Sequence, residues 1–139
     1  MQRKYLSTIF MVGLLLIACQ SFAQKNCTIR VNVKNILITK GNFYVALYNT
    51  EKGFLKAPCS KIQVPANRIT NGIVFSRLPA GEYAVTIFQD LNDNKSLDKV
   101  MSVPVEPYGL SNNVSAYPTY ANTKFLVADK ATITVNMRN

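Results

Sequence analysis

The chain has 139 residues, a length that suits one domain, and it contains no histidine. Without histidine there is no Ser-His or Cys-His nucleophilic pair, and the commonest zinc ligand is missing. The formal net charge is +9, but the basic residues are scattered, whereas proteins that bind nucleic acid gather them on one face or helix. We therefore expect one domain that binds no nucleic acid.

Residues 1–23 have the three parts of a secretory signal peptide. The basic start MQRK precedes the apolar run YLSTIFMVGLLLIA, which is too short and wrongly flanked for a membrane span. Ser21 and Ala23 then supply the small residues of a cleavage site. We expect residues 1–23 to be removed, which leaves 24–139 as a single secreted or periplasmic domain with no membrane span.

A second cleavage signal overlaps the first. The stretch LIAC, residues 16–19, resembles a bacterial lipobox, in which Cys19 is lipidated and becomes the new N-terminus. A lipid chain would convert a soluble protein into one anchored to the outer membrane. Plain secretion is the leading expectation, and a structural lipoprotein anchored at Cys19 is the alternative.

Two cysteines, Cys27 and Cys59, remain after cleavage at Ala23. An even number of cysteines in an exported protein predicts one disulfide. The bond would close a loop of roughly 32 residues and stabilise the fold by about 3–4 kcal/mol. Two separate thiols are the alternative, because geometry decides whether the bond forms.

Alternating apolar and polar residues predict strands along the mature chain. In CTIRVNVK the apolar residues occupy every second position, which is typical of a half-buried strand. Pro65 favours an edge position for the strand that contains it. The expected strands are 27–34, 43–49, 61–66, 72–78, 83–90, 123–128 and 131–137. About seven strands, short turns and no convincing helix predict an all-β fold, a Greek-key β-sandwich of the immunoglobulin-like kind.

The stretch DLNDNKSLD places an oxygen-bearing side chain at every second position, as a calcium loop does. Lys95 stands where such a loop wants glycine, and Met101 stands where it wants a bidentate glutamate. Any calcium site would therefore be weak, with a Kd on the order of 0.1–1 mM. A turn capped by its own side chains is the favoured interpretation. The candidate ligands are Asp90, Asn92, Asn94, Ser96 and Asp98.

A long segment without strand periodicity continues from residue 99 to 122. Its tyrosines and amides could stack on and hydrogen-bond a sugar or a peptide, and long loops in compact domains are often functional. The alternative is that the loop folds back over one sheet and its tyrosines serve as packing. The candidate binding surface consists of Glu106, Tyr108, Asn112, Asn113, Tyr117 and Tyr120.

The acidic residues do not form an obvious catalytic pair. The chain has 7 aspartates and glutamates, and nothing marks two of them as flanking a cleft, as acid-base hydrolysis requires. We therefore expect no enzymatic activity. A carbohydrate-active or other hydrolase that uses Asp90, Asp98 or Glu106 is the alternative.

Two stretches resemble a known family. LPAGEYAVTIFQDLNDNKSLD and VPVEPYGLSNN are similar to the motifs of domain-of-unknown-function family 2141, a group of exported bacterial proteins of uncharacterised role. The family's usual NGNGKLD is NDNKSLD here, so both glycines are replaced, and its usual phenylalanine is Leu110.

The resemblance implies a transthyretin-like or carboxypeptidase-regulatory-like sandwich and no established activity. We expect a non-enzymatic binding or accessory module whose working surface lies in residues 90–120. Its partner would be a glycan or an envelope protein.

Overall fold

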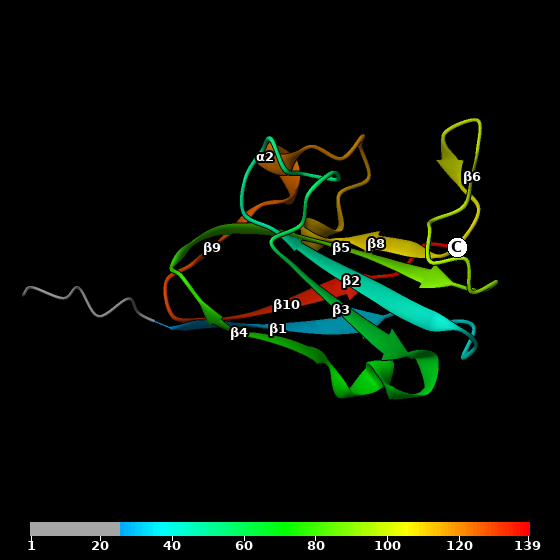
Figure 1. The fold of residues 1–139 in the computed structure, drawn as a ribbon, viewed down its shortest axis with the longest axis horizontal. Helices are drawn as coiled ribbons and strands as arrows, with labels where there is room; N and C mark the ends of the chain where they lie inside the picture. Colours follow the sequence, from blue (N-terminus) through cyan, green and yellow to red (C-terminus); the bar gives the residue numbers. More distant parts are fainter. Residues whose placement is uncertain (1–25) are drawn as a thin grey trace, which may run out of the picture.

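A computed structural model describes residues 26–139, and its regular structure consists mainly of strands (Figure 1). The expected signal peptide and Cys19 lie outside the described residues. No helix within 26–139 is long and apolar enough to cross a membrane. The strands are β1 (Cys27–Lys34), β2 (Asn42–Tyr48), β3 (Ser60–Pro65), β4 (Ile73–Leu78), β5 (Gly81–Asp90), β6 (Lys99–Val100), β7 (Val103–Pro104), β8 (Tyr108–Leu110), β9 (Phe125–Val127) and β10 (Lys130–Asn136).

The strands form two main sheets. The first has the order β10-β1-β4, with β1 and β10 parallel. The second has the order β3-β2-β5-β8, and β9 also pairs with β5. A bridge between Tyr108 and Arg138 connects β8 to the end of the chain beside β10. The described residues therefore form an all-β sandwich, as the alternating sequence predicts.

Each of the seven expected strands overlaps an observed one, but the segment after β5 is more ordered than expected. It contains the small hairpin β6–β7 and the short strand β8, which extends the second sheet. Three helical turns also occur, and none was expected from the sequence. They are η1 (Ala66–Asn71), η2 (Ser111–Asn113) and α2 (Tyr120–Thr123).

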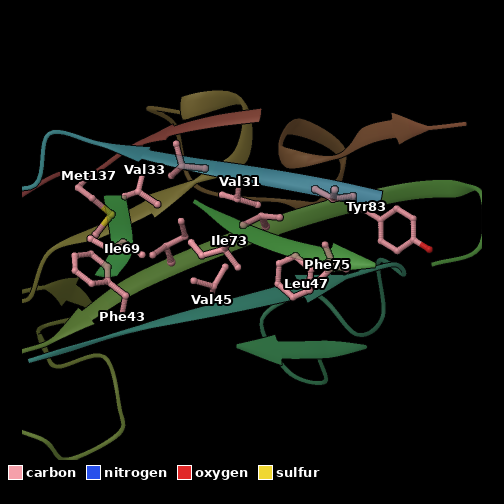
Figure 2. Packing of buried hydrophobic residues seen from close by; sticks show 14 of the residues in the cluster. Val31, Val33, Phe43, Val45, Leu47, Ile69, Ile73, Phe75, Tyr83 and Met137 are labelled. Atoms are coloured by element: carbon pink, nitrogen blue, oxygen red, sulfur yellow. The ribbon is translucent and has the colours of Figure 1, made fainter. Parts of the chain in front are cut away.

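The core lies between the two sheets, where the alternation places it. Val31 and Val33 of β1 point toward Phe43, Val45 and Leu47 of β2 (Figure 2). The alternate residues of both strands face outward, which is why the apolar positions recur with period two. β5 pairs with β2 in this packed sheet and ends at Asp90, where the candidate site begins.

The expected disulfide is wrong: no bond joins Cys27 to Cys59 among the described residues. Cys27 is fully buried at the start of β1, whereas Cys59 is exposed just before β3. The Cys59 thiol donates to the carbonyl oxygen of Leu47 at 3.3 Å. Although the residue is exposed, partial loss of water around its sulfur raises the pKa of this thiol, which lowers its thiolate fraction and hence its reactivity. An even number of cysteines does not show whether the fold brings two of them close enough to bond.

Candidate functional site

The loop from 90 to 98 begins at a buried carboxylate. Asp90 is fully buried at the end of β5. One of its carboxylate oxygens accepts the Asn94 N–H at 3.2 Å, and the other accepts the Lys95 N–H at 2.8 Å. Both carboxylate oxygens of Asp90 therefore stabilise the turn that follows β5.

The amide side chains continue this pattern. The Asn92 side-chain oxygen accepts the Asn94 N–H at 3.2 Å, and the Asn94 side-chain oxygen accepts the Ser96 N–H at 2.9 Å. Their amide nitrogens donate to the two carboxylate oxygens of Asp98, at 2.6 and 2.8 Å. Side chains that bond to the backbone two residues on are the signature of a self-capped turn. The geometry therefore fits the favoured interpretation of this loop.

A metal would have to share these oxygens with the hydrogen bonds that they already accept. The oxygens of Asp90, Asn92, Asn94 and Asp98 each accept an N–H group of the loop. Within residues 26–139 no three acidic, cysteine or histidine residues gather where they could hold a metal ion. Calcium binding by the loop stays a prediction of the sequence.

Two residues of the loop, Asp93 and Lys95, have a backbone conformation that glycine adopts most readily. Asp93 has φ of 60° and Lys95 has φ of 63°, in the left-handed region that non-glycine residues rarely adopt. Aspartate tolerates this region because its side chain bonds locally, whereas lysine has no such compensation. The loop therefore holds Lys95 in a backbone conformation to which lysine is poorly suited.

We expect Lys95→Gly to raise the free energy of unfolding by about 1 kcal/mol, because the substitution removes the strain of a left-handed lysine. Urea denaturation measures the change. The matched control is Lys99→Gly in β6, where φ is not positive and glycine should cost about 0.5–1 kcal/mol. Equal destabilisation by both substitutions would contradict the assignment of strain to Lys95.

Glu106 ties the two ends of the loop together. It is only 6% exposed, and its carboxylate oxygens accept the Leu91 N–H at 2.9 Å and the Asp98 N–H at 3.1 Å. The Val105 N–H returns a bond to the Asp98 carbonyl oxygen at 2.9 Å. Glu106 is thus a buried clamp that supports the loop from below, not part of an accessible surface as the sequence suggested.

Most other residues of the expected binding surface also make internal contacts. Tyr120 is buried and its hydroxyl donates to the Glu82 carbonyl oxygen at 2.9 Å. Asn112 donates to two backbone oxygens of the α2 segment, and Asn113 bonds to the backbone of β10. Tyr108 lies under the Arg138 guanidinium. The side chain of Tyr117, which is 84% exposed, makes no such contact within residues 26–139. Internal contacts therefore account for the other five side chains of this set.

An aromatic row crosses the outer face of the second sheet. Tyr44, Phe88 and Tyr108 occupy paired positions on β2, β5 and β8. The Tyr44 and Phe88 rings stack with centroids 5.1 Å apart and 12° between their planes. The alternation of the second strand placed Tyr44 on the face opposite Phe43, but only the strand pairing reveals that the three rings are neighbours.

The Tyr44 hydroxyl is poorly accommodated. Among the side chains that the structure describes, its oxygen is the buried polar atom that lacks a hydrogen-bond partner. Loss of water raises the pKa of Tyr44, and the negative charges of Asp90 and Asp93 raise it further. A neutral hydroxyl is therefore held beside the acidic loop.

We expect Tyr44→Phe to raise the melting temperature, because a buried hydroxyl without a partner costs stability. The raised pKa also means that the folded state keeps its proton longer than the unfolded chain. The stability that this retained proton contributes is fully present below the pKa of the unfolded chain, which is about 10. It is lost as the pH rises through the pKa of the folded state. Thermal unfolding between pH 8 and 11 should show a smaller alkaline loss in Tyr44→Phe than in the parent; an unchanged profile would contradict this.

Exposed apolar side chains gather at one end of the sandwich, which we call the apolar end. Of ten large hydrophobic residues that are exposed in the described chain, six lie there. A shallow groove of about 270 Å³ adjoins them, lined by Leu37, Ile38, Leu91, Val105, Pro107 and Asn139. The apolar end consists of Leu37, Ile38, Val100, Met101, Val103 and Val105.

The sequence contains a signal for this surface. The stretch KVMSVPV carries four apolar residues within a segment read as an irregular loop. In a loop exposed to water such a run has no partner to pack against, and contiguous exposed apolar patches mark interaction sites.

Comparison with known proteins gives a family and nothing more specific. A family model described as "Uncharacterized protein conserved in bacteria (DUF2141)" matches residues 31–135, from the middle of β1 to the end of β10. No curated protein and no solved structure matches the chain.

Proposed function

Because the chain belongs to the DUF2141 family of uncharacterised bacterial proteins, we propose a role that rests on its own surface: a non-enzymatic binding or accessory module that works outside the cytoplasm. The transthyretin-like relationship of its sandwich belongs to the same proposal. Sandwiches of that kind serve many unrelated roles, so the role must be argued from the site.

The apolar end carries the proposal. Met101 is 94% exposed at the turn of the β6–β7 hairpin, and Val100 and Val103 beside it are exposed as well. Val105 follows the hairpin and lines the groove together with the exposed Leu37 and Ile38. Leaving such groups in water forgoes about 25 cal/mol for each Å² of apolar surface. A soluble domain with an otherwise well-packed core keeps a patch of this kind where it meets a partner.

The placement of the carboxylates supports a module over a hydrolase. A hydrolase needs two carboxylates that converge on a cleft. The oxygens of Asp90, Asp98 and Glu106 accept N–H groups of the loop itself, and none of the three residues lines the groove. Through these hydrogen bonds they hold the loop and the hairpin that follows it in place.

A photo-crosslinking amino acid tests where the module binds. We expect the crosslinker at position 101 to form adducts with components of the cell envelope. The matched control is position 126 in β9, where Leu126 is as clearly exposed at the other end of the sandwich. Adducts of equal yield at both positions, or none at position 101, would contradict a contact surface at the apolar end.

Export is proposed from the signal peptide, and mass spectrometry of the mature N-terminus tests it. A free or cyclised Gln24 supports secretion after Ala23. A lipid-modified Cys19 would instead support the structural lipoprotein.

Calcium is tested by thermal unfolding. With a Kd of about 1 mM, about 10 mM calcium would stabilise the folded state by about 1.4 kcal/mol, and we expect no larger effect because the loop oxygens already accept N–H groups. Asp98→Ala should remove any shift. A shift that survives in Asp98→Ala would place the ion elsewhere.

A further inference from the structure

We propose that the apolar end inserts into the surface of an anionic lipid bilayer, with the β6–β7 hairpin entering first. This rests on the proposed function and names its partner. Figure 1 shows the hairpin labelled β6 standing clear of the sheets, at the end of the sandwich where the C-terminus lies.

The hairpin is built in a way that projects its apolar residues. Met101 and Ser102 form its turn with φ of 49° and 68°, the backbone of a tight two-residue hairpin that asparagine and glycine normally provide. Non-glycine residues in this region are strained, and such strain clusters at functional positions. Here it holds a methionine at the outermost point, with Val100 and Val103 exposed on either side of the turn.

A second loop supplies further apolar groups at the same end. Leu37 and Ile38 are exposed in the segment between β1 and β2 and line the groove together with Val105. The Gln89 side chain fastens this segment to β5 by donating to the carbonyl oxygens of Ile38 and Lys40, both at 2.7 Å. The groove therefore joins this segment to Val105, which directly follows the hairpin. A bilayer can accept exposed apolar groups of this kind at a depth of about 5–10 Å.

The exposed charges around this surface favour anionic lipid. Four lysines are exposed on the flanking segments, against the exposed carboxylate of Asp93 and the half-exposed carboxylate of Asp98. Asp90 and Glu106 are also acidic, but they are buried behind the hairpin. Lysines at the rim of an apolar tip reach the headgroups and attract negative lipids. The four are Lys34, Lys40, Lys95 and Lys99.

A lipid surface fits this arrangement better than a protein does. A protein partner would need a pocket shaped to a protruding methionine and a second pocket for Leu37 and Ile38. A bilayer accepts both protrusions without a matching shape, and the flexible side chain of methionine adapts readily to it. Without residues 1–23, which carry Arg3 and Lys4, the chain has 14 basic and 7 acidic residues, and this excess adds long-range attraction to an anionic surface.

The absence of tryptophan gives a direct test, because the chain contains none. We expect the emission of Met101→Trp to shift to the blue, and to be quenched by brominated acyl chains, when the mature protein meets phosphatidylcholine–phosphatidylglycerol vesicles. Leu126→Trp is the matched control and should show neither effect. Circular dichroism verifies that both variants fold.

Charge and apolarity are then separated by vesicle sedimentation. Lys95→Gln and Lys99→Gln should each weaken partitioning about fivefold, since each lysine near an anionic surface contributes a similar share. Val100→Ser with Val103→Ser should weaken it about tenfold, because apolar burial is lost. Lys130→Gln, in β10 and away from the apolar end, should leave it unchanged.

The proposal is overturned if Met101→Trp emission is the same with and without anionic vesicles, or if Lys130→Gln weakens partitioning as much as Lys99→Gln. If vesicles have no effect while the crosslinker at position 101 captures a protein, the lipid proposal fails and the binding module stands. If position 101 yields no adduct of any kind and vesicles have no effect, both fail.

Discussion

Replacing Glu106 with alanine is expected to lower the free energy of unfolding by about 3 kcal/mol. The substitution leaves the backbone N–H groups of Leu91 and Asp98 without the carboxylate oxygens that accept them at 2.9 and 3.1 Å. Both bonds join a charged acceptor at a buried site, and the loss of such bonds is among the costlier single changes. Urea denaturation measures the change.

Two further variants separate the clamp from a general loss of charge. Glu106→Gln keeps one oxygen acceptor, so it should cost about half as much as the alanine. Glu82→Ala removes an exposed carboxylate that pairs with Lys124 at 3.0 Å and should cost less than about 1 kcal/mol. If Glu106→Ala costs no more than Glu82→Ala, Glu106 is not the clamp.

The self-capping of the loop by its own side-chain oxygens could be predicted from the sequence. The contact by which Glu106 holds the two ends of the loop could not. Asp90, Asn94 and Asp98 lie within a short stretch, and the tendency of aspartate and asparagine to bond to nearby backbone favoured a self-capped turn. Glu106 is separated from Leu91 by 15 residues and reaches it only because the hairpin folds back. Nothing in a single sequence distinguishes a glutamate that points inward as a clamp from one that points outward to a ligand.

The β6–β7 hairpin was missed for a related physical reason. Sequence rules find hairpins through glycine and asparagine, which adopt positive φ at little cost. Here Met101 and Ser102 adopt it instead, so the turn carried no recognisable signal. The long strands were predictable because their alternation follows from burying one face, whereas β8 has three residues, too few to show a period.

The aromatic row shows the same limit at the level of the sheet. Alternation placed Tyr44 and Phe88 each on one face of its own strand, and that much was correct. Whether the two rings meet depends on the register between β2 and β5, which pairs Tyr44 with Phe88. Register is set by turns and by the packing of the whole sheet, and a local pattern does not contain it.

Gly41→Ala is expected to lower the free energy of unfolding by about 3 kcal/mol or more, because a methyl group has no room there. Gly41 has φ of +75°, and a Cβ at this position would lie 2.0 Å from the carbonyl oxygen of Asp90. Backbone cannot move aside as a flexible side chain does. The Gly41 carbonyl oxygen also accepts the Ala66 N–H at 3.1 Å, so a shift would disturb the entry to η1 as well.

The matched control is Gly81→Ala at the start of β5, where a Cβ would meet nothing within 4 Å. That substitution should be neutral or slightly stabilising, since alanine restricts the unfolded chain more than glycine does. Because Gly41 touches the residue from which the loop begins, Gly41→Ala should also displace the hairpin, and vesicle binding should weaken even where the protein remains folded. Equal stability of the two variants would show that the close approach of Gly41 to Asp90 does not constrain the fold.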